Sequence, residues 1–592
     1  MVTLGWVLTL FVFFSVILFC LGCDCSRVSL FLFVCVFCFL ILNCAGLYFY
    51  RQWWGPLGLF VFSTLSLGLV VLLLLVVFVG HVNFTTVWFV DLGRLFFLFD
   101  IFEVNLVFCV DGLALVSSVL VLVLTMFAQY FGVEYMYREA FILRLVYLLN
   151  FFATSVVFLF FVYDFFLILV VWELIGLFSL LLVNFYSLRI YTLKAAFKTF
   201  LFSRFSDFFI FIVFFFFVLV WQASDLGLLF VQIPFFLFYN IYVGPVGVNL
   251  LNLLGFFLVI SGAVKAAQFF FHVWLPDAME APTPASALIH SSTLVIMGIY
   301  LVIRFSILFE FSYLGNITLA VLGSVTVAVG AVSAAFQNDI KKLVAYSTVS
   351  QMGYLFCGCG FLAYREVLFY LAVHAANKAF LFILVGYIVH FFTGNTDMRF
   401  MGRLYAQGAD IVFLLFFVSF NLTGLPLTSG FFAKEFLVFQ TLRLDYFSLF
   451  VRLMWFFSFL LTPFYMFFLN IWVVFKSDQR FGSSVLFLSS VGYGNQPHYM
   501  SWLLVSRLFA KSTTLVLFVF FLLVTLTGDS FISGFFSLNW SPDPILFASW
   551  SGFGLNPGLF TVTNSGRVHY LLSFILLTLT AAALRYLVKL ST

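Results

Sequence analysis

The stretch 262–300, GAVKAAQFFFHVWLPDAMEAPTPASALIHSSTLVIMGIY, places a lysine, a helix break and a histidine in otherwise apolar sequence. Lys265 lies in one apolar run, three prolines interrupt the chain, and His290 lies in the next apolar run. A charge near the centre of a bilayer helix costs about 2.5–3.5 kcal/mol, so such residues usually face a protein interior or a water-filled cavity. Irregular backbone at that depth is tolerated under the same conditions. We therefore interpret this stretch as part of an ion-handling channel.

A carboxylate and three further charges lie upstream of this stretch. Glu173, within WELIGLFSLLL, has no partner close in sequence, which favours a functional role. Lys198, Arg204 and Asp207, within AAFKTFLFSRFSDFF, are three or six residues apart, so a helix would set them on adjoining parts of one face. Two simpler interpretations stay open. Lys198 could extend to the membrane surface, and Arg204 could only neutralise Asp207.

The second half of the chain repeats the theme. His374 and Lys378 are four residues apart, which places imidazole and ammonium on one helix face. In NLTGLPLTSGFFAKEFLVF, glycine and proline break a helix before Lys434 and Glu435. A charged turn that includes Lys341 opens a helix rich in small and hydroxyl residues. Paired helix interruptions in two halves of a chain are typical of an internally repeated transporter.

Composition defines the protein class. The 592 residues are 65% hydrophobic and 8% charged, whereas a soluble globular protein has roughly 25% charged residues. Apolar runs of about 20 residues fit membrane-spanning helices, and only helices or closed barrels satisfy the backbone in lipid. We therefore predict an all-α polytopic membrane protein with about 15–16 transmembrane helices and two related helical repeats, each containing a broken helix. A net charge of +4 without a basic cluster argues against nucleic-acid binding.

The same patterns suggest four regions. Residues 1–110 hold N-terminal spans near 4–22, 29–49 and 57–80 and a less regular segment, 81–110. Residues 111–310 and 311–445 form the two repeats, and 446–592 hold spans near 446–475, 502–526 and 568–588. Asp111 is expected to cap the helix that it precedes. A nicotinamide or flavin motif and a four-cysteine ligand set are absent from the sequence, so we expect no cofactor, metal or redox centre on this chain.

Several strings together resemble a known family. WELIGLFSLLL, AAFKTFLFSRFSDFF, KAAQFFFHVWLPDAMEAPTPASALIHSSTLV, DIKKLVAYSTVSQMGY, HAANKAFLF and GLPLTSGFFAKE, which cover roughly 110–445, are similar to the subunit 5 family of NADH dehydrogenase, the antiporter-like membrane subunits of respiratory complex I. The resemblance implies proton translocation in the mitochondrial inner membrane. NADH, FMN, iron–sulfur clusters and ubiquinone would then bind other subunits.

The resemblance also implies roles for single residues. Glu173 and Lys265 would form an input pair, with Arg204 and Asp207 tuning it. Lys378, assisted by His290 and His374, would be the central relay, and Lys434 the outlet lysine. Lys198, Lys341 and Glu435 would be supporting residues.

Partners follow from the same resemblance: other complex I membrane subunits, above all subunit 4, and lipids. The family's lateral helix is expected to be missing after residue 588, so a separate chain would supply it. The alternative is an Mrp-type sodium/proton antiporter subunit, which shares the same lysines.

Overall fold

A computed structural model describes most of the chain between residues 35 and 476. The described residues are 35–41, 43–44, 51–84, 87–98, 102–136, 139, 141–222, 224–243, 246–392, 394–402, 404, 409–425, 428–431, 433–434, 437 and 447–476. The predicted spans near 4–22, 502–526 and 568–588, most of 29–49, Glu435 and the position of the lateral helix lie outside these residues.

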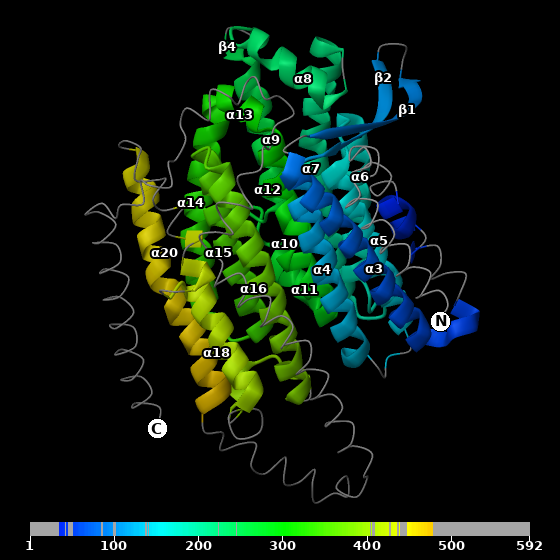
Figure 1. Ribbon diagram of the computed structural model, residues 1–592. Helices are drawn as coiled ribbons and strands as arrows, with labels where there is room; N and C mark the ends of the chain where they lie inside the picture. The colour runs from blue at the N-terminus through cyan, green and yellow to red at the C-terminus, as the bar shows by residue number, and fades with distance from the viewer. Residues whose placement is uncertain are drawn as a thin grey trace, which may run out of the picture.

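The described residues form a bundle of long helices (Figure 1). Within them, nine helical stretches are long and apolar enough to cross a membrane. This confirms the prediction of a polytopic helical membrane protein. The long helices are α3 (Arg51–Phe84), α4 (Gly112–Tyr135), α5 (Ile142–Phe161), α6 (Phe165–Val183), α7 (Ile190–Phe216), α9 (Leu250–Lys265), α12 (Leu294–Arg304), α14 (Tyr313–Ala335), α15 (Ile340–Gly360), α16 (Tyr364–Phe391), α18 (Ala409–Thr423) and α20 (Phe447–Asn470).

Shorter elements connect these helices. They are the helices α8 (Leu226–Gln232), α10 (Trp274–Asp277), α11 (Thr283–Ser291) and α13 (Ser306–Phe311), the 3₁₀ turns Ile233–Phe236, Ala278–Glu280 and Met398–Phe400, and the π-helical ends Phe217–Trp221 and Ile471–Phe475.

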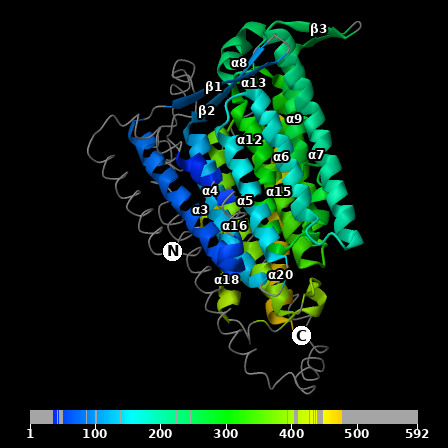
Figure 2. The same ribbon diagram turned by 90° about the vertical axis from the view of Figure 1, so that its right-hand side faces the viewer.

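Two β-hairpins accompany the helices of this all-α membrane fold. β1 (Trp88–Leu98) pairs with β2 (Phe102–Val110), and β3 (Asn240–Val243) pairs with β4 (Val246–Asn249), both antiparallel. The hairpins lie at one end of the bundle, together with α8 and α13 (Figures 1 and 2). The first hairpin lies within 81–110, which was predicted to be less regular. Arg94 lies opposite Asn105 in the register, and its Nε reaches Glu103 Oε2 of the neighbouring strand at 2.8 Å.

The predicted interruption after Lys265 is present, and a second one follows His290. α9 ends at Lys265, and the chain then turns through Ala267 and Phe270, whose φ angles are 51° and 70°. α11 ends shortly after His290, and Thr293, with φ −123° and ψ −84°, separates α11 from α12. His290 therefore lies in the last turn of a short half-helix, and the buried 283–304 span is discontinuous at that point.

Small residues allow two helices next to this region to approach closely. α14 and α15 pack along much of their length. A Cβ added at Gly330 of α14 would come 2.7 Å from the backbone nitrogen of Ser350 in α15. Close backbone approach at small residues is a common means of helix association in membranes. It fixes the position of α15, whose buried hydroxyl residues face α16 and α20.

Candidate ion-conducting residues

Lys265 is buried at the end of α9 beside a carboxylate of α7. Its side chain is 1% exposed, and Nζ lies 3.8 Å from Asp207 Oδ1. Nζ also lies 5.2 Å from the ring centroid of Trp172 in α6, within the range of a cation–π contact. Ser206 donates a hydrogen bond to the Ser261 carbonyl at 2.9 Å, which fastens α7 to α9 next to this pair. α7 thus holds the carboxylate in place against the buried ammonium.

Arg204 links Glu173 to the Lys265–Asp207 pair. Arg204 Nη1 lies 3.3 Å from Glu173 Oε2 and 3.5 Å from Asp207 Oδ2. From the family resemblance we expected Glu173 to pair directly with Lys265. In the structure Asp207 pairs with Lys265, and Glu173 pairs with the arginine. The difference arises because α7 contacts both α6 and α9, so its own carboxylate lies nearer to the lysine than the carboxylate of α6 does.

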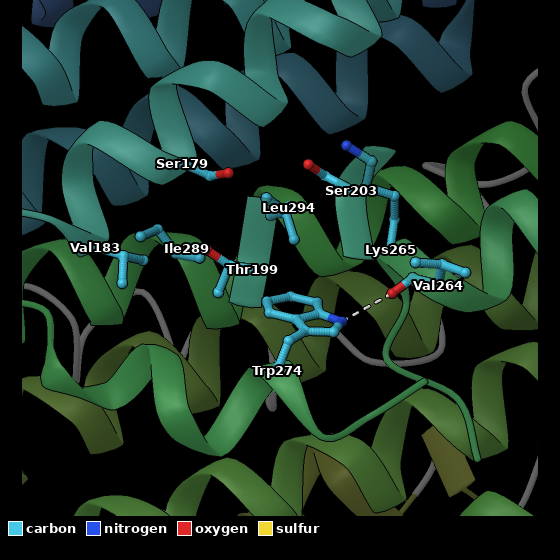
Figure 3. A pocket seen from close by; sticks show the side chains of 9 residues that line it. All are labelled: Ser179, Val183, Thr199, Ser203, Val264, Lys265, Trp274, Ile289 and Leu294. Atoms are coloured by element: carbon cyan, nitrogen blue, oxygen red, sulfur yellow. Dashed lines mark hydrogen bonds between the residues drawn. The ribbon is translucent and has the colours of Figure 1, made fainter. Parts of the chain in front are cut away.

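A small cavity adjoins Lys265 (Figure 3). Its volume of about 10 Å³ is close to the minimum for one water molecule. Ser179 and Ser203 offer hydroxyls to it, and Trp274 donates a hydrogen bond to the Val264 carbonyl at 3.0 Å. The complete lining is Ser179, Val183, Thr199, Ser203, Val264, Lys265, Trp274, Ile289 and Leu294. The buried lysine therefore has polar neighbours and space next to it.

Lys198 does not pair with the Lys265–Asp207 group. Its Nζ is 2.5 Å from Asp277 Oδ2 in α10, and the two side chains are 35% and 43% exposed. A half-exposed pair of this kind fits the interpretation of Lys198 as a residue that extends toward the surface. Lys341 lies in the first turn of α15, which packs against the 3₁₀ turn Ala278–Glu280.

His374 and Lys378 of α16 are also buried, as is His290 of α11, which packs against α16. Lys378 of α16 donates to Ser347 Oγ of α15 at 2.5 Å, and His374 lies one turn before it on α16. The His290 ring lies 6.2 Å from that of Phe382, one turn after Lys378. Both ring nitrogens of each histidine are buried without a hydrogen-bond partner in the structure. The spacing of four residues correctly predicted that His374 and Lys378 share one buried helix.

Lys434 lies at the broken end of α18. Its Nζ donates to the Leu422 carbonyl at 2.6 Å, and Leu422 belongs to the last turn of α18. Carbonyls in a last turn lack helical partners and carry the negative end of the helix dipole, so they stabilise an ammonium there. Gly424, with φ 76°, ends the helix as expected. The helix break therefore provides the free carbonyl that binds the Lys434 ammonium.

One buried ion pair, Asp111–Arg304, was not predicted from the sequence. Arg304 Nη1 donates to Asp111 Oδ2 at 2.6 Å, and Arg304 also bonds the Phe160 carbonyl at 3.0 Å and the Tyr300 hydroxyl. Asp111 accepts from Ala114 N at 2.9 Å, which confirms the predicted cap of α4. An arginine at the end of an apolar run, IYLVIRFSIL, was the available signal. The pair ties α12, which follows the break at His290, to the start of α4.

Comparisons with known proteins converge on one family. Residues 162–462 match the family model described as NADH:quinone oxidoreductase/Mrp antiporter, transmembrane. Relatives named NADH-ubiquinone oxidoreductase chain 5 include those of Nyctotherus ovalis, 39% identical over 71% of this chain and 23% of the relative, and Paramecium tetraurelia, 38% identical over 56% of this chain and 58% of the relative. The chain thus spans less than two thirds of the length of either relative. A structure titled as the Mrp complex from Dietzia sp. has the same fold, with a TM-score of 0.68, 21% identity, and coverage of 94% of this chain and 60% of that one.

Proposed function

Because this chain belongs to the NADH:quinone oxidoreductase/Mrp antiporter transmembrane family, we propose that it is subunit 5 of respiratory complex I and translocates protons through its buried charged residues. The relatives that support the subunit assignment carry the chain 5 name. The observation that carries the proton function is Lys265, fully buried in a membrane bundle and paired with Asp207 beside a cavity. Intramembrane ionisable groups of this kind mark ion pathways.

The geometry suggests how the first proton step works. At about 4 Å and an effective dielectric constant of about 20, a carboxylate stabilises an ammonium by about 4 kcal/mol. Arg204 lies within 3.5 Å of both Asp207 and Glu173, so it competes with Lys265 for Asp207. A shift of Arg204 toward Glu173 increases the electrostatic stabilisation of the Lys265 ammonium by Asp207. A shift of Arg204 toward Asp207 decreases that stabilisation. In this scheme Glu173 acts on Lys265 through the arginine.

The remaining site residues continue the path in this proposal. A proton released by Lys265 passes His290 to His374 and Lys378, and then Lys434, with Lys198, Lys341 and Glu435 in supporting roles. In this proposal the first repeat, 111–310, supplies the buried lysine Lys265, and the second, 311–445, supplies Lys378 and Lys434. The chain itself holds no redox group in this proposal, so NADH, FMN, iron–sulfur clusters and ubiquinone belong to other subunits.

The surroundings follow from the same assignment. We place the chain in the mitochondrial inner membrane, in contact with lipids and other membrane subunits of the complex, with subunit 4 as its neighbour. The alternative remains an Mrp-type sodium/proton antiporter subunit, which would exchange sodium without NADH.

The test is proton pumping by the assembled complex in sealed membrane vesicles. We expect NADH-driven acidification to fall in Lys265→Ala and in Asp207→Asn, because each change removes one partner of the buried pair. Lys194→Met, which changes an exposed lysine of the same helix as Asp207, serves as the matched control and should pump normally. Normal pumping by Lys265→Ala in complexes shown intact on a native gel would refute the proposal. Sodium-dependent proton exchange without NADH would favour the antiporter alternative.

A further inference from the structure

One tryptophan lies at the boundary between the Lys265 cavity and His290. Trp274, the first residue of α10, is 3% exposed, and its indole is part of the cavity lining (Figure 3). The centroid of the same indole lies 6.3 Å from the centroid of the His290 ring. His290 itself does not line the cavity. The indole is therefore a neighbour of both the first lysine and the first histidine of the proposed path.

Two polar contacts hold this tryptophan and its helix in place. Trp274 Nε1 donates to the Val264 carbonyl at 3.0 Å, directly before Lys265 in the last turn of α9. At the other end of α10, Asp277 Oδ2 lies 2.5 Å from Lys198 Nζ of α7. α10 also packs against α7 and α15. The indole is thus fastened to α9, and the helix that carries it is fastened to α7.

α7 connects this indole to the carboxylate that pairs with Lys265. Lys198 and Asp207 lie on this one helix, and Thr199 and Ser203, between them in the chain, line the cavity. Asp207 faces Lys265 at 3.8 Å, whereas Lys198 pairs with α10. A movement of α7 that changes the distance between Asp207 and Lys265 would therefore also act on α10 through Lys198.

The cavity between these elements is small and partly apolar. Its volume of about 10 Å³ is close to the minimum for one water molecule. Ile289 and Leu294, on either side of the break that follows His290, add apolar side chains to the lining beside the indole. Apolar constrictions in channels exclude water until they widen, and proton transfer needs a hydrogen bond or a bridging water. This constriction can therefore control when water joins Lys265 to His290.

We propose that Trp274 is a gate that separates Lys265 from His290 and opens when α7 moves, so that a proton passes between the two only at that stage. The inference rests on the proposed function. In the open state a water molecule accepts the proton that the Lys265 ammonium gives up and donates one of its own hydrogens to a His290 ring nitrogen. Lys265 ends as the neutral amine, His290 as the imidazolium, and the water is unchanged. Trp274 exchanges no proton and acts as a positioning residue.

The competing explanation is that Trp274 only fills the core. Buried tryptophans usually do so, and their N–H usually has a hydrogen-bond partner. Trp221, at the π-helical end of α7, offers a matched control. It is 6% exposed, and its ring lies 4.9 Å from that of Phe217 and 5.0 Å from that of Phe236. Loss of either indole leaves a similar space in the bundle, but Trp221 does not line the Lys265 cavity.

The experiment compares Trp274→Ala, Trp274→Phe and Trp221→Ala in the assembled complex, reconstituted in sealed vesicles. NADH first builds a pH gradient, an inhibitor then stops NADH oxidation, and a pH-sensitive dye follows the decay of the gradient. We expect Trp274→Ala to speed the decay about two-fold or more, because water then joins Lys265 to His290 at all times. Trp274→Phe, which keeps an aromatic ring, and Trp221→Ala should decay like the wild type. Adding Lys265→Met to Trp274→Ala should restore slow decay, because the leak passes through the lysine.

Four outcomes would overturn the gate. Normal decay in Trp274→Ala would show that the indole only packs, while a loss of pumping in Lys265→Ala would still support the proposed function. Equally fast decay in Trp221→Ala would show that any missing indole loosens the bundle. Fast decay that persists after Lys265→Met is added would show that the leak takes another route. Normal pumping in Lys265→Ala would refute the proposed function, and the gate with it. If Trp274→Ala does not assemble, Trp274→Leu, which keeps an apolar side chain without the indole, is tested with the same expectation.

Discussion

Replacing Asp111 by asparagine should destabilise the protein far more than the same change at Asp277. The two ion pairs are almost equally short, 2.6 Å for Asp111–Arg304 and 2.5 Å for Asp277–Lys198. Their burial differs, because the side chains of the first pair are 0% and 5% exposed and those of the second are 43% and 35% exposed. Asparagine caps a helix about as well as aspartate, so the change at Asp111 removes the charge and keeps the cap.

The magnitude follows from the charge left behind. Removing one partner of a buried pair costs about 3–5 kcal/mol, because the other charge stays buried without compensation. Arg304 would retain only neutral acceptors, the Tyr300 hydroxyl, the Phe160 carbonyl and the amide oxygen at position 111. An exposed pair contributes about 0–1 kcal/mol, which sets the expectation for Asp277→Asn. Since domains are stable by about 5–15 kcal/mol, the first change removes a large part of the total.

The assay is unfolding of the purified chain in detergent, followed by tryptophan fluorescence. Adding Arg304→Met to Asp111→Asn should recover much of the lost stability, because the unpaired charge is then gone. Equal destabilisation by Asp111→Asn and Asp277→Asn would refute the argument from burial. Failure of Arg304→Met to recover any stability would show that the cost does not come from the orphaned arginine.

Two further predictions concern a carboxyl and a glycine. Burial raises the pKa of Glu310 from 4.5 to about 7, so the folded chain binds this proton more tightly than the unfolded chain. The melting temperature should therefore fall as pH rises from about 4.5 to about 7. In Glu310→Gln this fall should be smaller. The same pH dependence in the variant and the wild type would contradict the raised pKa of Glu310. Gly298→Ala should destabilise the chain by about 1–3 kcal/mol, because a Cβ there would overlap the Gly262 carbonyl and come 2.9 Å from Ala266 N, next to Lys265. Gly176→Ala, where the nearest atoms are 3.4 Å away, is the control, and equal melting temperatures for the two variants would contradict the packing argument.

Much of the candidate site could be predicted from residue type and hydropathy. Lys265, His374, Lys378 and Lys434 stand out because a charge or imidazole in an apolar run needs a polar environment inside the protein. The structure confirms that all four are buried. Their roles in proton transfer, and the division of the chain into two repeats, stay predictions.

Some local features were not recognised in the sequence. The segment Ser291, Ser292 and Thr293 ends a helix without glycine or proline, so it lacks the usual signal for a break. The hairpin β1–β2 is rich in aromatic and β-branched residues, which in an apolar chain resemble a further membrane helix or loop. In both cases the local pattern fits more than one backbone conformation, and packing against the rest of the bundle selects one.

The sequence by itself determined that the chain spans a membrane as helices, that two of these are interrupted, and which ionisable residues lie inside. These properties follow from the cost of placing charge and free backbone groups in hydrocarbon, which depends on residue type and order alone. Only the tertiary structure decided which groups meet. Asp207 rather than Glu173 contacts Lys265, and Arg304 pairs with Asp111, which is 193 residues away in the sequence. These contacts depend on which helices pack together and on how each helix is rotated about its axis.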